Sequence, residues 1–237
     1  VRGYGKVAQQ VPEKNHPTNP VYLLDHAPIK SMEDFAGAHA VRALYFFAGA
    51  ADLYLEIGDQ ELWDALKRLW TKTKMKMYIT GGLGSRYEGE SFGEDYELPN
   101  YRAYSETCAS AAGVMWAWRM FLASGDPEYM DTLETILYNA ALAGISLDGS
   151  RYFYVNPLAD YYAKYERQPW FECACCPPNI ARLITWVPSI AYSFSKNEPK
   201  IWINLFMESE AKFNLSGNTV KIDIETRYPW EDYVSVK

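Results

Sequence analysis

Cysteine is the residue type whose placement in this sequence most directly predicts chemistry. Of the four cysteines, Cys173, Cys175 and Cys176 fall within four positions, while Cys108 lies far upstream, two residues after Glu106. Adjacent cysteines followed by prolines favour a thiolate cluster over a disulfide framework. The sequence therefore predicts a tetrahedral zinc site formed by Glu106, Cys108, Cys175 and Cys176. Inert buried thiols are the alternative interpretation, because the cysteines do not form the two CxxC pairs that frame many structural zinc sites.

A zinc cluster of this kind has two chemical roles open to it. Four protein ligands ordinarily define a structural zinc, because a catalytic zinc keeps one position open for water. The exception is a ligand thiolate that is itself the nucleophile and that the metal keeps deprotonated. An enzyme of that second kind also needs a proton donor.

The segment between Gly81 and Asn100 offers candidates for that donor. Its acidic residues are Glu88, Glu90, Glu94, Asp95 and Glu97. Long loops in compact domains are usually functional, so we expect this acidic loop to lie at the site. Its glycine-rich start lacks the Lys-Ser/Thr pair of a phosphate-binding loop, and we do not expect it to bind phosphate.

Hydrophobic periodicity and capping residues predict helices on both sides of this loop. The expected ranges are 31–55 (with Ser31 as its cap), 59–76, 105–123, 126–143 and 178–193. Residues 105–123 are so apolar that this helix should be buried on most sides. Cys176 precedes a proline, and prolines suit the first turn of a helix. We therefore expect the cysteines to lie at helix N-termini, where the dipole favours the thiolate.

An internal repeat links two of these helix pairs. The pattern Leu-x-x-Gly-Asp at residues 55–59 recurs at residues 122–126. Each copy marks a helix, a tight Gly-Asp turn and a returning helix, so the sequence predicts two αα-hairpins of one series. Together with the helix at 178–193 they form an arc of a helical toroid.

Beyond residue 195 the pattern changes to the period-two alternation of antiparallel strands. The segments 201–206, 211–215 and 220–224 alternate, and Gly217-Asn218 supplies a turn. We predict a helical domain over residues 1–195 and the start of a β domain over residues 196–237. Strand edges left open at residue 237 would be exposed, so we expect the natural protein to be longer at both ends.

Composition limits the partners that this chain can have. A formal net charge of −7 disfavours nucleic acid and anionic membranes as main partners. The sequence contains no 18-residue apolar span, so no transmembrane helix is expected.

Reduced, metal-bound cysteines favour a cytoplasmic location for the protein. The chain opens on Val1 and shows no signal peptide. For the oligomeric state of the protein, we consider a homodimer.

A series of short motifs runs along essentially the whole chain. They are Gly81-Gly82-x-Gly84, Gly89-Glu90-x-Phe92, Tyr96-x-Leu98-Pro99-Asn100, Glu106-Thr107-Cys108-Ala109, Leu137-Tyr138-Asn139, Phe153-Tyr154-Val155-Asn156-Pro157 and Cys173-Ala174-Cys175-Cys176-Pro177-Pro178-Asn179. In this order they resemble glycoside hydrolase family 127, the β-L-arabinofuranosidases. The resemblance implies a mainly α fold, in which the C-terminal part of an (α/α)6 toroid, residues 1–195, is followed by the beginning of a β-sandwich domain, residues 196–237.

The resemblance also implies roles for individual residues. The zinc ligands of the family match Glu106, Cys108, Cys175 and Cys176. Its nucleophile matches Cys175 and its acid/base matches Glu90, while His39 and Tyr154 match sugar-contacting positions. Without the resemblance, His39 would be interpreted as a core histidine on a helix face, Tyr154 as a strand core residue and Glu90 as a solvated carboxylate.

The function implied by the resemblance is retaining glycoside hydrolysis by an enzyme that holds Zn²⁺. The Cys175 thiolate would attack the anomeric carbon of an L-arabinofuranosyl oligosaccharide or glycoconjugate, and Glu90 would act as acid and then as base. We expect Glu90 to have a raised pKa because its neighbours Glu88, Glu94 and Asp95 carry like charges. One alternative is a toroid-fold sugar epimerase or inverting hydrolase with purely structural zinc. The other is a non-catalytic carbohydrate-binding protein.

Overall fold

The computed structural model describes residues 27–161, 165–195, 198–215 and 217–237. The chain divides into two compact units, of which the first ends at Ala181 and the second runs from Arg182 to Lys237. The expected helices begin only at residue 31, and most of the chain before that residue lies outside the described residues.

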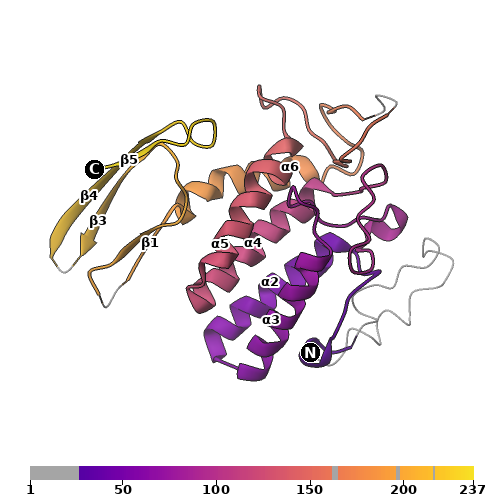
Figure 1. The fold of residues 1–237 in the computed structure, drawn as a ribbon, viewed down its shortest axis with the longest axis horizontal. Helices are drawn as coiled ribbons and strands as arrows, with labels where there is room; N and C mark the ends of the chain where they lie inside the picture. Colours follow the sequence, from indigo (N-terminus) through magenta and orange to yellow (C-terminus); the bar gives the residue numbers. More distant parts are fainter. Residues whose placement is uncertain (1–26, 162–164, 196–197, 216) are drawn as a thin grey trace. The chain divides into compact units, whose positions relative to one another are not determined.

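Two helical hairpins make up the main part of the first unit (Figure 1). Their helices are α2 (Ala40–Ile57), α3 (Gln60–Met75), α4 (Thr107–Ser124) and α5 (Pro127–Thr135). Helix α4 packs against α2 and α5, so it lies at the centre of the unit. Helix α5 continues as a π-helical segment, Ile136–Ala141, and a 3-10 turn, Leu142–Gly144. A further helix, α6 (Cys176–Trp186), begins in this unit.

The turns of the two hairpins confirm the predicted repeat. Gly58 ends α2 with a left-handed backbone at φ 65°, and the Asp59 side chain accepts a hydrogen bond from Leu62 N at the start of α3. Gly125 ends α4 at φ 70°, and Asp126 caps α5 in the same way. Glycine adopts this conformation without strain, and an aspartate N-cap satisfies a free amide of the first turn.

An aromatic cluster fills the core between the hairpins. Trp116 of α4 is fully buried, and its ring centroid lies 5.0 Å from Phe47 of α2 and 5.0 Å from Trp70 of α3. Phe35, which precedes α2, contacts both Phe47 and Phe92 of the acidic loop at about 5 Å. The same cluster therefore joins the helices to the loop.

The predicted start of the first helix is wrong. Residues Ile29–Ser31 form only a 3-10 turn, and α2 begins at Ala40 with His39 as its N-cap. The cause is local, because the Asp34 carboxylate accepts hydrogen bonds from the backbone amides of Phe35 and Ala36 and turns the chain away from a helix. His39 consequently lies at a helix end and not on a helix face.

The glycine-rich loop serves close packing. A Cβ on Gly81 would lie 2.6 Å from Ile136 Cα, and one on Gly82 would lie 2.1 Å from the Ser105 hydroxyl oxygen. Gly81 also has a positive φ of 81°. Only glycine permits these approaches, so the loop can pass directly against the segment that leads into α4.

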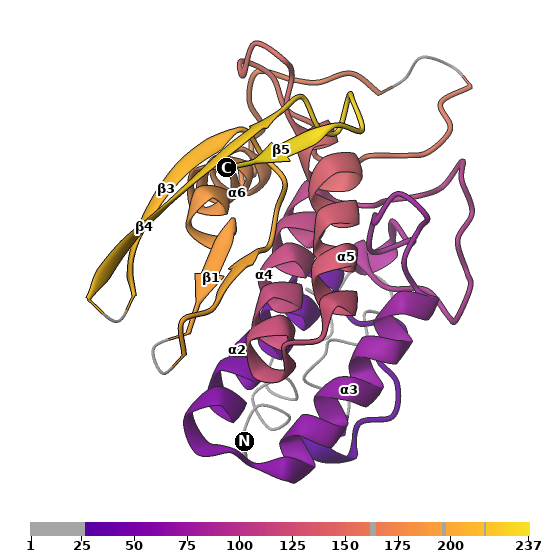
Figure 2. The ribbon, with the colours of Figure 1, turned by 60° about the vertical axis from the view of Figure 1, so that its left-hand side comes forward.

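After the end of α6 and a 3-10 turn, Val187–Ile190, the second unit consists of antiparallel strands (Figure 2). A two-stranded sheet pairs β1 (Tyr192–Phe194) with β2 (Ile201–Ile203), and a three-stranded sheet has the order β3 (Ser209–Leu215), β4 (Asn218–Thr226) and β5 (Val234–Val236). In the β3–β4 hairpin Leu215 pairs with Asn218, so the hairpin is present but Asn218, predicted as part of the turn, already belongs to β4. Helix α6 ends at Trp186, before Pro188, so the expected helix through Ser193 is too long. The domain boundary at residue 196 and the β-sandwich stay predictions.

Candidate metal and catalytic site

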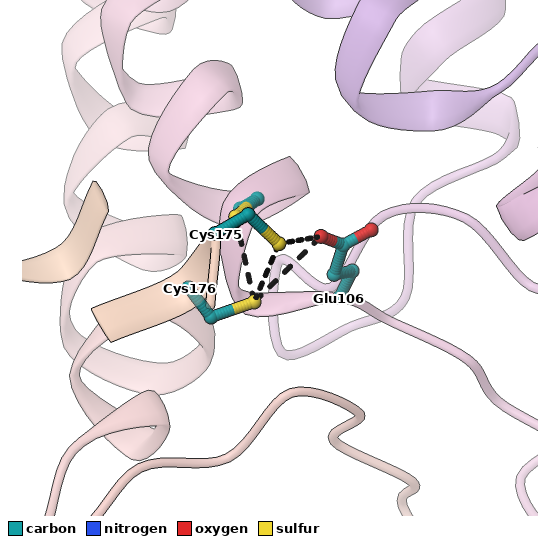
Figure 3. A group of neighbouring side chains, drawn as sticks. Glu106, Cys175 and Cys176 are labelled. Atoms are coloured by element: carbon teal, nitrogen blue, oxygen red, sulfur yellow. Dashed lines mark hydrogen bonds between the residues drawn. The ribbon is translucent and has the colours of Figure 1, made fainter. Parts of the chain in front are cut away.

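Four side chains from two distant parts of the first unit form a compact cluster. The ligand atoms of Glu106, Cys108, Cys175 and Cys176 all lie within 4.8 Å of one another. Figure 3 shows the Glu106 carboxylate directed at the Cys175 and Cys176 thiols. Glu106 Oε1 is 3.4 Å from Cys175 Sγ and 3.6 Å from Cys176 Sγ. The two adjacent sulfurs are 3.8 Å apart, and Cys108 Sγ lies 3.4 Å from Cys176 Sγ. The structure thus brings together the four residues that the spacing of the cysteines predicted.

Two helix N-termini position this cluster. Glu106 is the N-cap residue of α4, with an extended backbone, and Cys108 is the second residue of that helix. Cys176 is the first residue of α6, and Cys175 directly precedes it. Ser105, the residue before Glu106, has a left-handed backbone at φ 44°, which changes the direction of the chain immediately before Glu106. The prediction that the cysteines lie at helix N-termini is confirmed.

The electrostatics of the cluster concentrate one negative charge on Cys175. Hydrogen bonds from Cys108 and then Cys176 lower the pKa of Cys175. The same contacts make ionisation of a second thiol harder, and the pKa of Cys176 is raised. Burial, followed by the charge of Cys175, raises the pKa of the Glu106 carboxyl to about 8. Of the four groups, Cys175 is therefore the one most readily ionised.

The donor set suits a cation. Glu106 is only 2% exposed, and its Oε2 atom is buried with no hydrogen-bond partner among the described residues. Buried polar atoms are normally satisfied, so an orphaned carboxylate oxygen beside three thiols fits a metal-binding group. The Glu106, Cys108, Cys175 and Cys176 group can therefore hold a metal ion.

A second group lies next to the cluster and shares Glu106 with it. His39, Glu90 and Glu106 also have their ligand atoms within 4.8 Å of one another. His39 Nε2 is 2.8 Å from Glu90 Oε2, and the Tyr104 hydroxyl donates to Glu90 Oε1 at 2.8 Å. Glu90 follows Gly89 in a short turn and itself has a positive φ of 51°. Such strain in a non-glycine residue is typical of functional positions.

The expected rise in the pKa of Glu90 is wrong. The hydrogen bond from His39 is the largest effect and lowers the pKa, and the bond from Tyr104 acts in the same direction. The neighbouring carboxylates do not act on Glu90 as predicted because each lies beside a cation, which Glu94 shares with Glu97. Glu88 pairs with Arg102 at 2.8 Å, Glu94 lies 3.8 Å from Arg86, and Asp95 pairs with Lys76 at 2.8 Å.

These ion pairs also fix the acidic loop. Lys76, at the end of α3, is only 1% exposed and donates to Asp95 and to the carbonyl oxygen of Gly93. Arg86 donates to both carboxylate oxygens of Glu97, which lowers the pKa of Glu97 to about 2. The loop that carries Glu90 is therefore attached at several points to the helical core.

The remaining predicted site residues occupy distinct places. Tyr154 lies beside the cluster, where it helps to lower the pKa of Cys175, and the backbone of Thr107 donates to the Tyr154 carbonyl oxygen at 3.0 Å. His39 contacts Glu90 as described. Cys173 is exposed and does not belong to the cluster. Tyr104 was missed by sequence reasoning, and its only signal is its position two residues before Glu106.

Comparison with known proteins defines the class of this helical unit, which is a glycoside hydrolase catalytic domain. Within that class the chain belongs to family 127, because the family model described as "Beta-L-arabinofuranosidase, GH127 catalytic domain" matches residues 2–189.

Relatives and solved structures agree with this assignment. A non-reducing end β-L-arabinofuranosidase from Bifidobacterium longum is 39% identical over 226 residues, which cover 91% of this chain and 34% of that protein. Two solved structures each match 92% of the chain with a TM-score of 0.86. One is the GH127 β-arabinofuranosidase BT3674, 38% identical and covered over 34% of its length. The other is Ara127N, a GH127 β-L-arabinofuranosidase from Geobacillus stearothermophilus T6, 40% identical and covered over 37%.

The matched structures also confirm the predicted fold class. The chain is mainly helical, and it comprises part of a helical toroid followed by the start of a β domain. It spans about a third of the length of the relatives that it matches.

Proposed function

We propose that this chain belongs to a retaining glycoside hydrolase that releases β-linked L-arabinofuranosyl groups. One observation carries the proposal, namely that Glu106 is shared by two groups, the thiol cluster containing Cys175 and the His39–Glu90 pair. A nucleophile and a proton donor are the two parts that a retaining glycosidase needs on either side of the bond it breaks. The names of the relatives supply the sugar.

The metal in this proposal is zinc, held by Glu106, Cys108, Cys175 and Cys176. Zinc–sulfur bonds of about 2.3 Å in a tetrahedral arrangement place two sulfurs roughly 3.8 Å apart. The sulfur–sulfur distances of 3.4 and 3.8 Å are close to that separation, which supports a tetrahedral ion. When bound, zinc would keep the ligand thiols deprotonated, Cys175 included.

The reaction then proceeds in two displacements. The Cys175 sulfur attacks the anomeric carbon and forms a C–S bond, while the C–O bond breaks and the leaving oxygen takes a proton from Glu90. In the second step Glu90 removes a proton from water, whose oxygen forms the new C–O bond as the C–S bond breaks and Cys175 leaves as the thiolate. Two inversions give net retention. A nucleophile and acid/base pair about 5 Å apart would leave no room for a water between sulfur and sugar.

Two neighbouring residues support these steps. Tyr154 helps to lower the pKa of Cys175 and in this proposal orients its sulfur, and His39 holds one oxygen of Glu90. In the proposal both side chains also contact the sugar, which is an L-arabinofuranosyl oligosaccharide or glycoconjugate.

Among the residues that the structure describes, no helix has the length and apolar character that crossing a membrane requires. The cytoplasmic location and the homodimer stay predictions.

The experiment that tests this function compares cysteine variants of the full-length protein. Cys175→Ala should abolish hydrolysis of an aryl β-L-arabinofuranoside, whereas Cys173→Ala should retain it, because Cys173 is an exposed cysteine outside the cluster. Zinc content is measured on both, and the anomeric configuration of the first product is followed by NMR. Near-normal hydrolysis by Cys175→Ala with zinc still bound would exclude the thiolate mechanism.

The same measurements separate the two alternatives. Inverted product with retained zinc would favour an inverting hydrolase, and interconversion of free sugars would favour an epimerase, with the zinc structural in both. A wild-type protein that binds sugars but hydrolyses no aryl furanoside would be a carbohydrate-binding protein.

A further inference from the structure

The carboxylate of Glu90 is held on both of its oxygens. His39, the N-cap of α2, lies 2.8 Å from Oε2, and the Tyr104 hydroxyl donates to Oε1 at 2.8 Å. Tyr104 is 7% exposed, whereas 35% of the Glu90 side chain is exposed. A partly exposed carboxylate thus has two fixed, more buried partners from different parts of the fold.

Glu90 needs such partners because its own element is a short turn. Glutamate has three side-chain torsions, and the terminal one is broad, so a free carboxylate samples many orientations. The turn at Gly89 and Glu90 has positive φ at both residues and contains no regular helix that would restrict the side chain. The direction of the carboxylate is therefore set by the groups that bond to it.

Tyr104 is itself firmly placed. Asn156 N donates to the Tyr104 carbonyl oxygen at 3.1 Å. The Tyr104 ring meets the rings of Tyr87 and Tyr154 edge to face, with centroids 5.0 and 6.4 Å away. Since backbone and ring are both fixed, its hydroxyl is a preorganised donor to Glu90.

We infer that Tyr104 is a positioning residue that aims the Glu90 carboxyl group at the leaving oxygen. This inference rests on the acid/base role proposed above for Glu90. Tyr104 does not touch the substrate in this account. It acts only through Glu90, by restricting the carboxyl group to orientations in which the proton can be delivered.

The dependence of the rate on the leaving group distinguishes positioning from a general structural role. A leaving group such as an alkoxide or a second sugar needs a proton as the bond breaks, whereas an activated nitrophenolate leaves largely without one. General acid catalysis contributes about 10²–10⁴-fold, and small misplacements of a catalytic group cost up to about 10²-fold. Tyr104→Phe should therefore lower kcat by about 10–100-fold on an L-arabinofuranosyl disaccharide, but by less than about 3-fold for formation of the glycosyl-enzyme from the nitrophenyl furanoside.

The matched control is Tyr87→Phe. The Tyr87 ring packs on Tyr104, but its hydroxyl lies 2.5 Å from the Tyr165 hydroxyl, so its removal leaves the bonds of Glu90 intact. The test uses full-length, zinc-loaded protein and single-turnover kinetics with both substrates. Thermal unfolding of each variant is recorded, and Glu90→Gln supplies the complete loss of the acid.

The outcomes separate this inference from the proposed function. A leaving-group-dependent loss in Tyr104→Phe, with KM little changed and no such dependence in Tyr87→Phe, supports positioning. The inference is overturned if Tyr104→Phe lowers the rate equally on both substrates. It is also overturned if Tyr104→Phe lowers the rate no more than Tyr87→Phe does, while the loss in Glu90→Gln depends on the leaving group. If Glu90→Gln itself shows no such dependence, the acid/base role fails and the inference fails with it.

Discussion

Cys175 Sγ lies 3.4 Å from Glu106 Oε1, although 69 positions separate the two residues in the sequence. Through this contact the start of α4 meets the start of α6, and the thiols of Cys108 and Cys176 complete the cluster. A metal at this point would cross-link the two helix ends. Removing it should therefore change stability as well as activity.

The first prediction concerns metal binding and stability. A ligand that binds only the folded state stabilises it by about 4 kcal/mol at a concentration of about 1,000 times Kd. We expect Cys176→Ser to lose stoichiometric zinc and to unfold at a lower temperature, and a strong chelator to lower the unfolding temperature of the wild type. Cys173→Ser is the control, because that exposed cysteine lies outside the cluster. Metal analysis and thermal unfolding check both, and equal zinc loss in the two variants would contradict the assignment.

The second prediction concerns the lysine under the acidic loop. Lys76 is 1% exposed and pairs with Asp95 at 2.8 Å and Asp34 at 3.2 Å. Leaving a buried charge unpaired costs about 3–5 kcal/mol, but Asp34 and Asp95 are 37% and 30% exposed and also pair with Lys72. Lys76→Met should therefore cost less than that in urea unfolding, through the lost ion pairs and the lost hydrogen bond to the Gly93 carbonyl oxygen. Lys74→Met, which breaks only the surface pair with Glu128, should cost about 0–1 kcal/mol. Similar costs for the two variants would refute a special role for Lys76.

Short-range patterns in the sequence predicted the parts of the fold that depend on neighbouring residues. The Gly-Asp turns after Leu55 and Leu122 needed only a left-handed glycine and an aspartate cap, and both hairpins are present. The cysteine spacing likewise predicted that Cys175 and Cys176 share one environment, because adjacent thiols can scarcely avoid it. Glu106 and Cys108 were expected as their distant partners, and the resemblance to the family implied that Cys173 is not part of the group.

The environment of Glu90 was not predictable in the same way. Its pKa is lowered because His39 and Tyr104 meet it, and those contacts arise from the path of the loop. That path depends on distant contacts, such as the bridge between His39 and Ser91. Counting nearby carboxylates in the sequence gave the wrong sign, since it ignored the cations Arg86, Arg102 and Lys76 that lie beside them.

The third prediction concerns acid stability. Arg86 lowers the pKa of Glu97 from 4.5 to about 2. A depressed carboxyl pKa contributes stability that is fully present above the unfolded pKa and is lost as the pH falls through the folded pKa. Stability should therefore decline between about pH 4.5 and pH 2, and Glu97→Gln should make that decline shallower. Urea unfolding at several pH values measures the slope. Arg86→Lys, which cannot bond to both oxygens, should give an intermediate slope, and an unchanged slope in Glu97→Gln would contradict the prediction.

The fourth prediction compares two glycines inside helices. A Cβ on Gly49 of α2 would meet no heavy atom within 4 Å in the described part of the chain, whereas one on Gly113 of α4 would lie 2.7 Å from Leu83 Cδ1 and 3.3 Å from Ile136 Cδ1. Alanine gains about 0.5–1 kcal/mol over glycine in a helix, and overpacking a core costs about 1–3 kcal/mol. Gly49→Ala should raise the urea midpoint and Gly113→Ala should lower it. Because the two changes are chemically identical, a raised midpoint in both variants would show that Leu83 can move aside and that this contact does not limit the approach of the loop to α4.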